Sequence, residues 1–143
     1  MSKYGMAETI IKDLPCLIEA LTDMGWTKEQ ISVYDTPQQL IDFQGHPTKY
    51  LDATGDRAEV IIRRQFVRGL SNDIGFKRNP LTGRFEAIVS AYDQSLQGAS
   101  WRKKLEVNYA ERFTIKTAQK QGLRFAGYGP KKADKRELLF VKG

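Results

Sequence analysis

The stretch from residue 73 to residue 93 limits the fold most, because it reads as a β-hairpin with a defined turn. Asn79, Pro80, Thr82 and Gly83 supply turn-forming residues between two apolar, β-favouring runs. Strand alternation divides the second run into two faces: Phe85, Ala87, Val89 and Ala91 on one, and Glu86, Ile88, Ser90 and Tyr92 on the other. Both faces become apolar toward the end of the run. This pattern predicts an inner strand of a sheet rather than an edge.

Periodic apolar residues elsewhere predict the elements that surround this hairpin. One helix is expected between Asp13 and Gly25, and a longer one over residues 101–121 with Ser100 as its N-cap. Strands are expected over residues 4–10, 31–34, 59–67, 123–128 and 136–141. Residues 36–56 are expected to be rich in loops. In a chain of 143 residues this order predicts one α+β domain, with an antiparallel sheet of about five to six strands and two helices packed mainly on one face.

The charge of the chain is divided unevenly between its two parts. Residues 1–60 carry 5 Lys/Arg and 10 Asp/Glu, whereas residues 61–143 carry 18 and 7, so that the net charge is +6. A basic second part favours an electropositive surface that binds an acidic protein, a larger assembly or nucleic acid. The alternative is that both sets of charges form solvated faces that lie close together in the fold.

Cations near the start of the long helix form the first candidate binding group. Arg102, Lys103 and Lys104 follow Trp101 and are expected in the first helical turn. Positive side chains there oppose the helix macrodipole, at a cost of roughly 0.3–1 kcal/mol each when exposed. A bound anion, or the acidic first part of the chain, would relieve this repulsion, and local packing with solvent screening is the alternative.

Arginines and lysines near the predicted meander form the second candidate group: Arg63, Arg64, Arg68, Lys77, Arg78 and Arg84. Phe66, Phe76 and Tyr92 lie among them in the sequence. Basic and aromatic side chains on an open sheet face are typical of platforms that stack single-stranded bases. Aromatics in strands are also typical core residues, and alternation alone can direct the arginines to solvent.

Lys131 and Lys132 form the third candidate group, in the expected turn over residues 129–135. The preceding Gly127-Tyr-Gly-Pro superficially resembles a phosphate-binding loop. Such loops lead from a strand into a helix N-terminus, whereas this one lies between two predicted strands. We therefore expect a basic hairpin tip, whose lysines can meet phosphate or acidic protein from outside.

Little in the sequence favours catalysis. Cys16 and His46 are the only cysteine and histidine, so we expect no internal disulfide, no metal site and no cofactor. Cys16 lies among apolar residues of the first predicted helix, which disfavours a Cys16–His46 nucleophilic pair. Asp73, Glu86 and Asp93 are explained by turn and cross-strand positions. No apolar run is long enough to span a bilayer, and the N-terminus lacks a secretory signal.

Five segments are similar to motifs of the hypothetical chloroplast open reading frame thirty-five family of plastids and cyanobacteria. They are Met1-Ser-Lys-Tyr4, Ala20-Leu-Thr-Asp-Met-Gly25, Asn72-Asp-Ile-Gly-Phe76, Phe85-Glu-Ala-Ile-Val-Ser90, and Tyr109-Ala110 with Ala118 and Gln121-Gly-Leu123. They resemble the family's opening, first helix end, Tyr-Asp-Ile-Gly-Phe motif, Tyr-Glu-Leu-Val-Ala-Asp strand and second helix end. The chain departs from the family at Lys3, where members have histidine, in a longer loop over residues 35–56, and in its basic turn over residues 131–136.

This resemblance implies a photosynthetic lineage, either plastid, cyanobacterial or that of a phage of such a host, and no established reaction. The expected location is then the cytoplasm, the chloroplast stroma or the cytoplasm of the phage host. We expect a non-catalytic accessory protein that binds a macromolecular partner through its basic residues. The alternative is a module that binds single-stranded nucleic acid.

Overall fold

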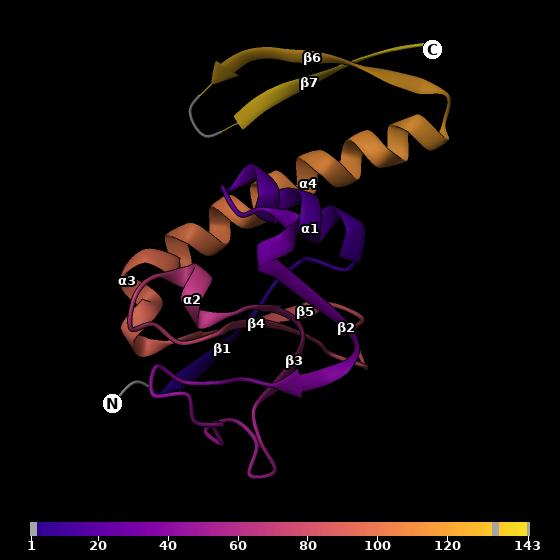
Figure 1. The fold of residues 1–143 in the computed structure, drawn as a ribbon. Helices are drawn as coiled ribbons and strands as arrows, with labels where there is room; N and C mark the ends of the chain where they lie inside the picture. Colours follow the sequence, from indigo (N-terminus) through magenta and orange to yellow (C-terminus); the bar gives the residue numbers. More distant parts are fainter. Residues whose placement is uncertain (1–2, 133–134, 143) are drawn as a thin grey trace.

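The computed structural model describes residues 3–132 and 135–142, with the side chains of residues 130–132, 135 and 136 outside the described set. It contains a five-stranded antiparallel sheet and a separate two-stranded ribbon (Figure 1). The sheet consists of β1 (Tyr4–Glu8), β2 (Ile31–Gln39), β3 (Arg57–Ile62), β4 (Ile74–Arg78) and β5 (Phe85–Ser90). The ribbon consists of β6 (Leu123–Lys132) and β7 (Lys135–Lys142). The helical elements are α1 (Leu14–Asp23), η1 (Lys28–Gln30), α2 (Arg64–Val67), η2 (Ala91–Asp93), α3 (Gln94–Gln97) and α4 (Ala99–Lys120).

The sheet has the strand order β1-β5-β4-β3-β2, with every neighbouring pair antiparallel. Strands β2 to β5 follow one another as a meander, and β1 then pairs with β5. The predicted hairpin is confirmed as β4 and β5, in which Phe76 lies opposite Ala87. Both strands are inner strands of the sheet, as the apolar character of both faces predicts.

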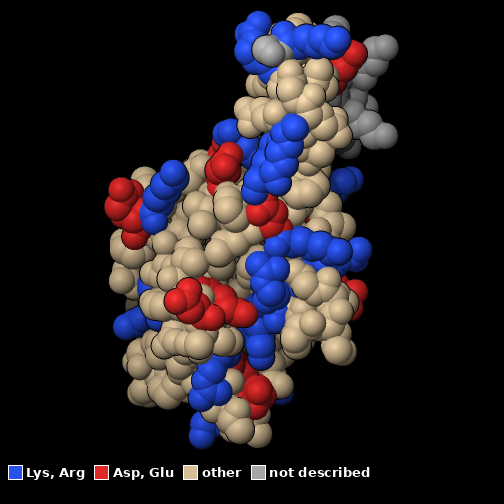
Figure 2. Space-filling model, turned by 90° about the vertical axis from the view of Figure 1, so that its right-hand side faces the viewer, with Lys and Arg blue, Asp and Glu red and all other residues tan. Residues whose placement is uncertain are grey.

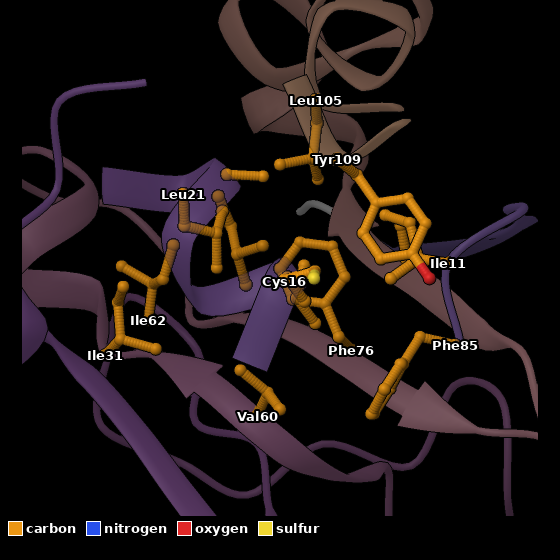
Figure 3. Packing of buried hydrophobic residues seen from close by; sticks show 14 of the residues in the cluster. Ile11, Cys16, Leu21, Ile31, Val60, Ile62, Phe76, Phe85, Leu105 and Tyr109 are labelled. Carbon is orange, nitrogen blue, oxygen red and sulfur yellow. The ribbon is translucent and has the colours of Figure 1, made fainter. Parts of the chain in front are cut away.

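One face of the sheet is covered by α1 and α4, which places both main helices on the same side (Figure 1). Side chains from β3, β4 and β5 meet α1 and α4 in one apolar cluster: Val60, Ile62, Phe76, Phe85, Cys16, Leu21, Leu105 and Tyr109 are among its members (Figure 3). Phe85, Ala87 and Val89 all belong to this cluster, whereas Ile88 does not. The predicted alternation is therefore confirmed for residues 85–90, whereas Ala91 and Tyr92, expected from the sequence to continue it, lie in η2.

The opposite face is covered by the long loop over residues 40–56. Leu40 packs there with Tyr4, Ala58, Ile61 and Ile88, all of which are buried. The contact is close at Gly75 of β4, where a Cβ atom would lie 2.8 Å from the Cβ of Ala58. A glycine is therefore required at this position of the Asn-Asp-Ile-Gly-Phe segment.

A buried carboxylate holds the end of this loop. Asp56 is 1% exposed, and its oxygens accept hydrogen bonds from the backbone N–H groups of Tyr50, Leu51 and Asp52 at 2.7–3.1 Å. Charged acceptors make the stronger class of hydrogen bond, so this turn is well fixed without regular secondary structure. The loop that the sequence leaves without a predicted element is thus an ordered cover for the sheet.

Several expected elements differ from those observed. Strands β2 and β6 continue to Gln39 and Lys132, beyond the strands expected over residues 31–34 and 123–128. The strand predicted over residues 59–67 ends at Ile62, and the chain turns into α2, so Arg63, Arg64 and Arg68 do not lie on a strand. The final hairpin forms its own two-stranded sheet instead of joining the main one. The long helix begins at Ala99 with Gly98 as its N-cap, so Ser100 lies inside the helix rather than capping it. Within the described residues, no helix combines the length and apolar character that crossing a bilayer requires.

Candidate functional site at the arginine corner

The candidate site lies at one end of the sheet, where β3 and β5 end and β4 begins. We call this region the arginine corner and define it by residues 63–73 and 90–93, which follow β3 and β5 and precede β4. It contains three partly exposed arginines, Arg63, Arg64 and Arg68, and two aspartates. The aspartates, Asp73 and Asp93, are fully buried. Buried carboxylates require compensating donors, and the hydrogen bonds to these two residues organise the corner.

Asp73 joins the corner to the long loop and to β1. Its carboxylate accepts hydrogen bonds from the Arg63 guanidinium at 2.9 Å and from the backbone N–H groups of Arg64 at 2.7 Å and Ile41 at 2.8 Å. Its backbone carbonyl accepts the Tyr4 hydroxyl at 2.7 Å. One residue therefore fixes the start of α2, the loop and the edge strand together.

Asp93 organises the other side of the corner. Its carboxylate accepts hydrogen bonds from the hydroxyls of Ser71 and Ser90, the latter at 2.7 Å, and forms an ion pair with Arg68 at 3.2 Å. The Asn72 amide lies 3.4 Å from the same carboxylate and donates to the Ser90 hydroxyl at 3.0 Å. The segment before β4 is thereby tied to the turn that follows β5.

Burial and charge shift the pKa values of the groups around Asp73. Burial raises the pKa of Tyr4 above its ordinary value, and the nearby carboxylates of Asp73 and Asp93 add to this shift. The hydrogen bond from Arg63 lowers the pKa of Tyr34 and outweighs its burial. Burial lowers the pKa of Arg63, but its hydrogen bonds to Tyr34 and Asp73 reverse this and leave a net increase. Arg63 is therefore a charged structural partner of Asp73.

A solvent-open pocket of about 510 Å³ lies on the outside of the corner. Its lining residues are Arg64, Gln65, Arg68, Gly69, Leu70 and Ser71. Arg64 donates one hydrogen bond to the Phe43 carbonyl at 2.7 Å and forms no ion pair with any described residue. Leu70 is 80% exposed and has a φ of 54°, a left-handed conformation that is rare for a branched side chain. The pocket thus combines an uncompensated guanidinium with an exposed apolar side chain.

Exposed aromatic rings border this pocket. Tyr92 is 51% exposed, and the Arg68 guanidinium lies 4.7 Å from the centre of its ring, within cation–π distance. Phe66 is 40% exposed on α2, and its carbonyl accepts the indole N–H of Trp26. Trp26 in turn packs edge-on against Trp101 of α4, with ring centres 5.7 Å apart.

Through these tryptophans, the first candidate group lies beside the arginine corner (Figure 1). Arg102, Lys103 and Lys104 form no ion pair with a described residue. Because the helix begins at Ala99, they lie in its second turn, where the macrodipole repulsion expected from the sequence has largely decayed.

The residues of the second candidate group lie at two opposite ends of the sheet. Arg63, Arg64 and Arg68 lie at the end where β4 begins, whereas Lys77, Arg78 and Arg84 lie at the end where β4 leads into β5. At that far end, Arg78 stacks over Phe85 and donates to the carbonyls of Lys12 and Gly83. The expected platform of aromatics on an open sheet face is wrong, because Phe76 is fully buried while Phe66 and Tyr92 lie outside the strands.

The third candidate group cannot be placed, because the side chains of Lys131 and Lys132 lie outside the described set; their backbone belongs to β6. The pairing of β6 with β7 confirms that the segment lies in a hairpin and not at the start of a helix.

The acidic first part of the chain neutralises a different set of cations. Arg112 of α4 pairs with Asp23 at 2.6 Å and with Glu19 at 3.5 Å, and Lys116 pairs with Asp13 at 2.7 Å. These pairs join α4 to α1 and leave the three cations of the second turn without acidic partners among the described residues. On the face drawn in Figure 2, basic and acidic side chains are intermixed, and both kinds are seen at the top of the picture.

Cys16 and His46 do not form a nucleophilic pair. Cys16 is buried between α1 and the sheet, whereas His46 is exposed on the loop that covers the opposite face. Burial raises the pKa of Cys16 to about 12, and its hydrogen bond with Asp13 adds to the shift. The described residues also hold no cluster of three His, Cys, Asp or Glu side chains that could bind a metal ion.

Sequence reasoning missed the pocket residues Gln65, Gly69, Leu70 and Ser71. The available signal was the polar run over residues 71–73, which follows shortly after Gly69 and contains three side chains that the fold buries completely or nearly so. A turn that buries its polar residues needs a partner for each of them, and those partners come from distant positions.

The sequence profile of one family, described as "Protein of unknown function (DUF1257)", matches residues 20–138 of the chain. No curated protein and no solved structure shows a significant match.

Proposed function

Since the chain belongs to the DUF1257 family, for which no function is known, we propose from its own chemistry that it is a non-catalytic binding protein whose arginine corner docks an acidic segment of another protein. Arg64 would bind a carboxylate of that segment. Leu70 and Phe66 would contact its apolar side chains. Arg102, Lys103 and Lys104 would extend the basic surface along α4.

The observation that carries this proposal is the uncompensated guanidinium of Arg64 in an open pocket. Arg63 and Arg68 are neutralised by buried carboxylates, but Arg64 has only a carbonyl partner. A guanidinium presents a planar set of donors that matches a carboxylate, which favours Arg64 as the anchor. The exposed apolar residues beside it favour a protein partner over a small inorganic anion.

A second candidate function is binding of single-stranded nucleic acid. The specific observation in its favour is the exposed ring of Tyr92, with the Arg68 guanidinium against it. An unpaired base can stack on an exposed aromatic ring, and neighbouring cations can contact the phosphates of the nucleic-acid backbone. The platform for such binding would be this corner rather than the sheet face.

Two soluble probes, poly-L-glutamate and a single-stranded RNA oligonucleotide, separate the two functions. We expect poly-L-glutamate to bind, and the double variant Arg64→Glu with Lys103→Glu to weaken it at least about tenfold by replacing attraction with repulsion. Arg84→Glu, which reverses an exposed charge at the far end of the sheet, is the matched control and should retain binding.

Preferential binding of RNA with a steep loss of affinity as salt rises would favour the second function instead. If the wild type and the Arg64→Glu/Lys103→Glu variant bound each of the two probes equally well, both proposed functions would be contradicted. Affinity capture from a cyanobacterial lysate, with the double variant as the comparison, would then identify the natural partner.

We place this activity in a photosynthetic lineage, in the cytoplasm or the chloroplast stroma, or in the cytoplasm of a phage host. This part of the proposal depends on the motifs shared with the chloroplast reading frame family. Detection of the tagged protein in a different compartment of such a cell would contradict it.

A further inference from the structure

The ribbon formed by β6 and β7 has only two strands, so each of them has one edge without a neighbouring strand. Strand β6 packs along α4, and no strand of the described residues pairs with β7 on the side away from β6 (Figure 1). Phe125 lies opposite Phe140, and Tyr128 lies opposite Leu138, which places these side chains on one face. Leu139 and Val141 alternate with them and therefore lie on the other face.

The apolar side chains of the described part of the ribbon are incompletely covered. None is buried; Tyr128 is 46% exposed, and Leu139 and Val141 are each 40% exposed. An isolated pair of strands is marginal in water and needs further packing for its stability. The ribbon therefore presents both unpaired backbone groups and apolar surface along the same strand.

The edges of the main sheet are protected in ways that β7 is not. Strand β1 has only five residues. Strand β2 contains an irregularity between Val33 and Gln38, and Pro37 within it cannot donate a backbone hydrogen bond. Strand β7 has eight residues and contains neither proline nor glycine. The described residues thus form four sheet edges: β1 and β2 are closed to strand addition, β6 has two register irregularities and packs along α4, and β7 is open.

The charge of the ribbon identifies the kind of strand that fits this edge. Residues 123–142 carry six Lys/Arg and two Asp/Glu, and β7 itself has three basic residues and one acidic residue. Pairing with a second copy would bring two basic strands together, and like charges on paired strands are destabilising. An acidic strand from a different protein is attracted by the same charges.

We propose that β7 is a strand-addition site that pairs with an extended acidic segment of a partner protein. The partner's backbone would complete the hydrogen bonds of the open edge. Its apolar residues would cover Leu139 and Val141, while its carboxylates meet the ribbon's cations. This surface is separate from the arginine corner, and its use does not depend on the function proposed for that corner.

The full-length protein, titrated with a synthetic peptide of alternating glutamate and valine, tests this site by nuclear magnetic resonance. We expect saturable binding, with amide chemical-shift changes centred on β7 and slower amide exchange there. The double variant Leu139→Glu with Val141→Glu should lower the affinity at least about tenfold, because it replaces two apolar contacts with repulsive charges. Cross-strand contacts between β6 and β7 in this variant would show that the ribbon still forms.

Three controls make the outcome specific. Leu81→Glu changes a leucine that is 94% exposed on the β4–β5 turn and should leave binding unchanged. A peptide with lysine in place of glutamate should not bind. The glutamate–valine peptide with its alternate backbone nitrogens methylated should also fail, because it cannot donate the edge hydrogen bonds.

Equal binding of the methylated peptide would show ordinary electrostatic attraction and overturn the proposal. Shift changes confined to the arginine corner would overturn it as well, while supporting the function proposed there. If light scattering instead showed a dimer that the Leu139 and Val141 variant dissociates, the occupant would be a second copy, contrary to the proposal. Should the ribbon variant lose its cross-strand contacts, Lys142→Glu is the substitute variant, and unchanged affinity in it would count against the site.

Discussion

Asp73 shows how one side chain can determine the backbone around it. Its carboxylate is fully buried and accepts donors from both α2 and the long loop. Replacement by asparagine would remove the charge that pairs with the Arg63 guanidinium, and would put an NH2 donor in place of one acceptor oxygen, facing N–H groups that need an acceptor. The cost of an unpaired buried donor exceeds the net gain from an ordinary hydrogen bond.

We therefore predict that Asp73→Asn lowers the free energy of unfolding by about 3 kcal/mol, because it breaks a largely buried ion pair. Chemical denaturation followed by circular dichroism measures this change. Asp35→Asn is the control: Asp35 is exposed on β2 and forms no ion pair among the described residues, so a change within about 0.5 kcal/mol is expected. A similarly small effect at Asp73 would contradict the structural role assigned to it.

Cys16 gives a second prediction at the scale of a single residue. Its thiol is 1% exposed and its pKa is raised to about 12, so hardly any thiolate exists near neutral pH. We expect the native protein to resist a disulfide reagent such as Ellman's reagent at pH near 8, and the urea-unfolded protein to react at once. Rapid labelling of the native state would show that α1 opens, or that the thiol is available for chemistry.

At the scale of whole elements, the sequence predicts regular apolar patterns well and long-range polar contacts poorly. The alternation of Phe85, Ala87 and Val89 correctly predicts the two faces of β5, because the pattern of neighbouring residues determines which face is buried. No such local pattern predicts where β3 ends. The strand stops where Asp73, ten residues further along the chain, binds the side chain of Arg63 and the backbone N–H of Arg64.

The same limit explains the outcome for the candidate site. Charge counting finds the cations but not their partners, so it groups Arg64 with Lys77, Arg78 and Arg84 at the opposite end of the sheet. It also assigns the acidic first part no specific contacts. In the fold, those acidic residues pair with Arg112 and Lys116. Distinguishing a neutralised arginine from a free one requires the tertiary structure.

The contact between α1 and α4 predicts a dependence of stability on pH. Burial of Asp13 tends to raise its pKa, but hydrogen bonds with Cys16 and Lys116 outweigh this and lower the pKa below its usual value of 3.8. A carboxyl with a lowered pKa in the folded state stabilises the protein at neutral pH, and this contribution is lost as the pH falls through the folded pKa.

We therefore expect Asp13→Asn to lower the urea midpoint at neutral pH, and the difference from the wild type to shrink as the pH falls below the usual carboxyl pKa. Urea titrations over a series of pH values measure this difference. Glu29→Gln, on the exposed turn after α1, provides a comparison away from the α4 contact. A difference that stays constant down to the lowest pH would contradict the ion pair with Lys116.

For the molecule as a whole, burial is concentrated in the sheet, α1 and the first half of α4. Between residues 110 and 120 only Ala118 is buried, and no described residue of the ribbon is. Local opening requires less free energy where fewer apolar side chains are covered. We predict that amide hydrogens of β6 and β7 exchange much faster than those of β3, β4 and β5 in native-state hydrogen exchange. Comparable protection in both sheets would show that the ribbon unfolds only with the whole domain.

The length of α4 has a geometric consequence for any partner. Its 22 residues extend about 33 Å, with the arginine corner beside its first turns and the start of β6 after its last. A single extended peptide would need about ten residues to cover that distance. Short linear motifs can therefore occupy one end only, and simultaneous contact with both ends selects for a folded partner or for two motifs joined by a spacer.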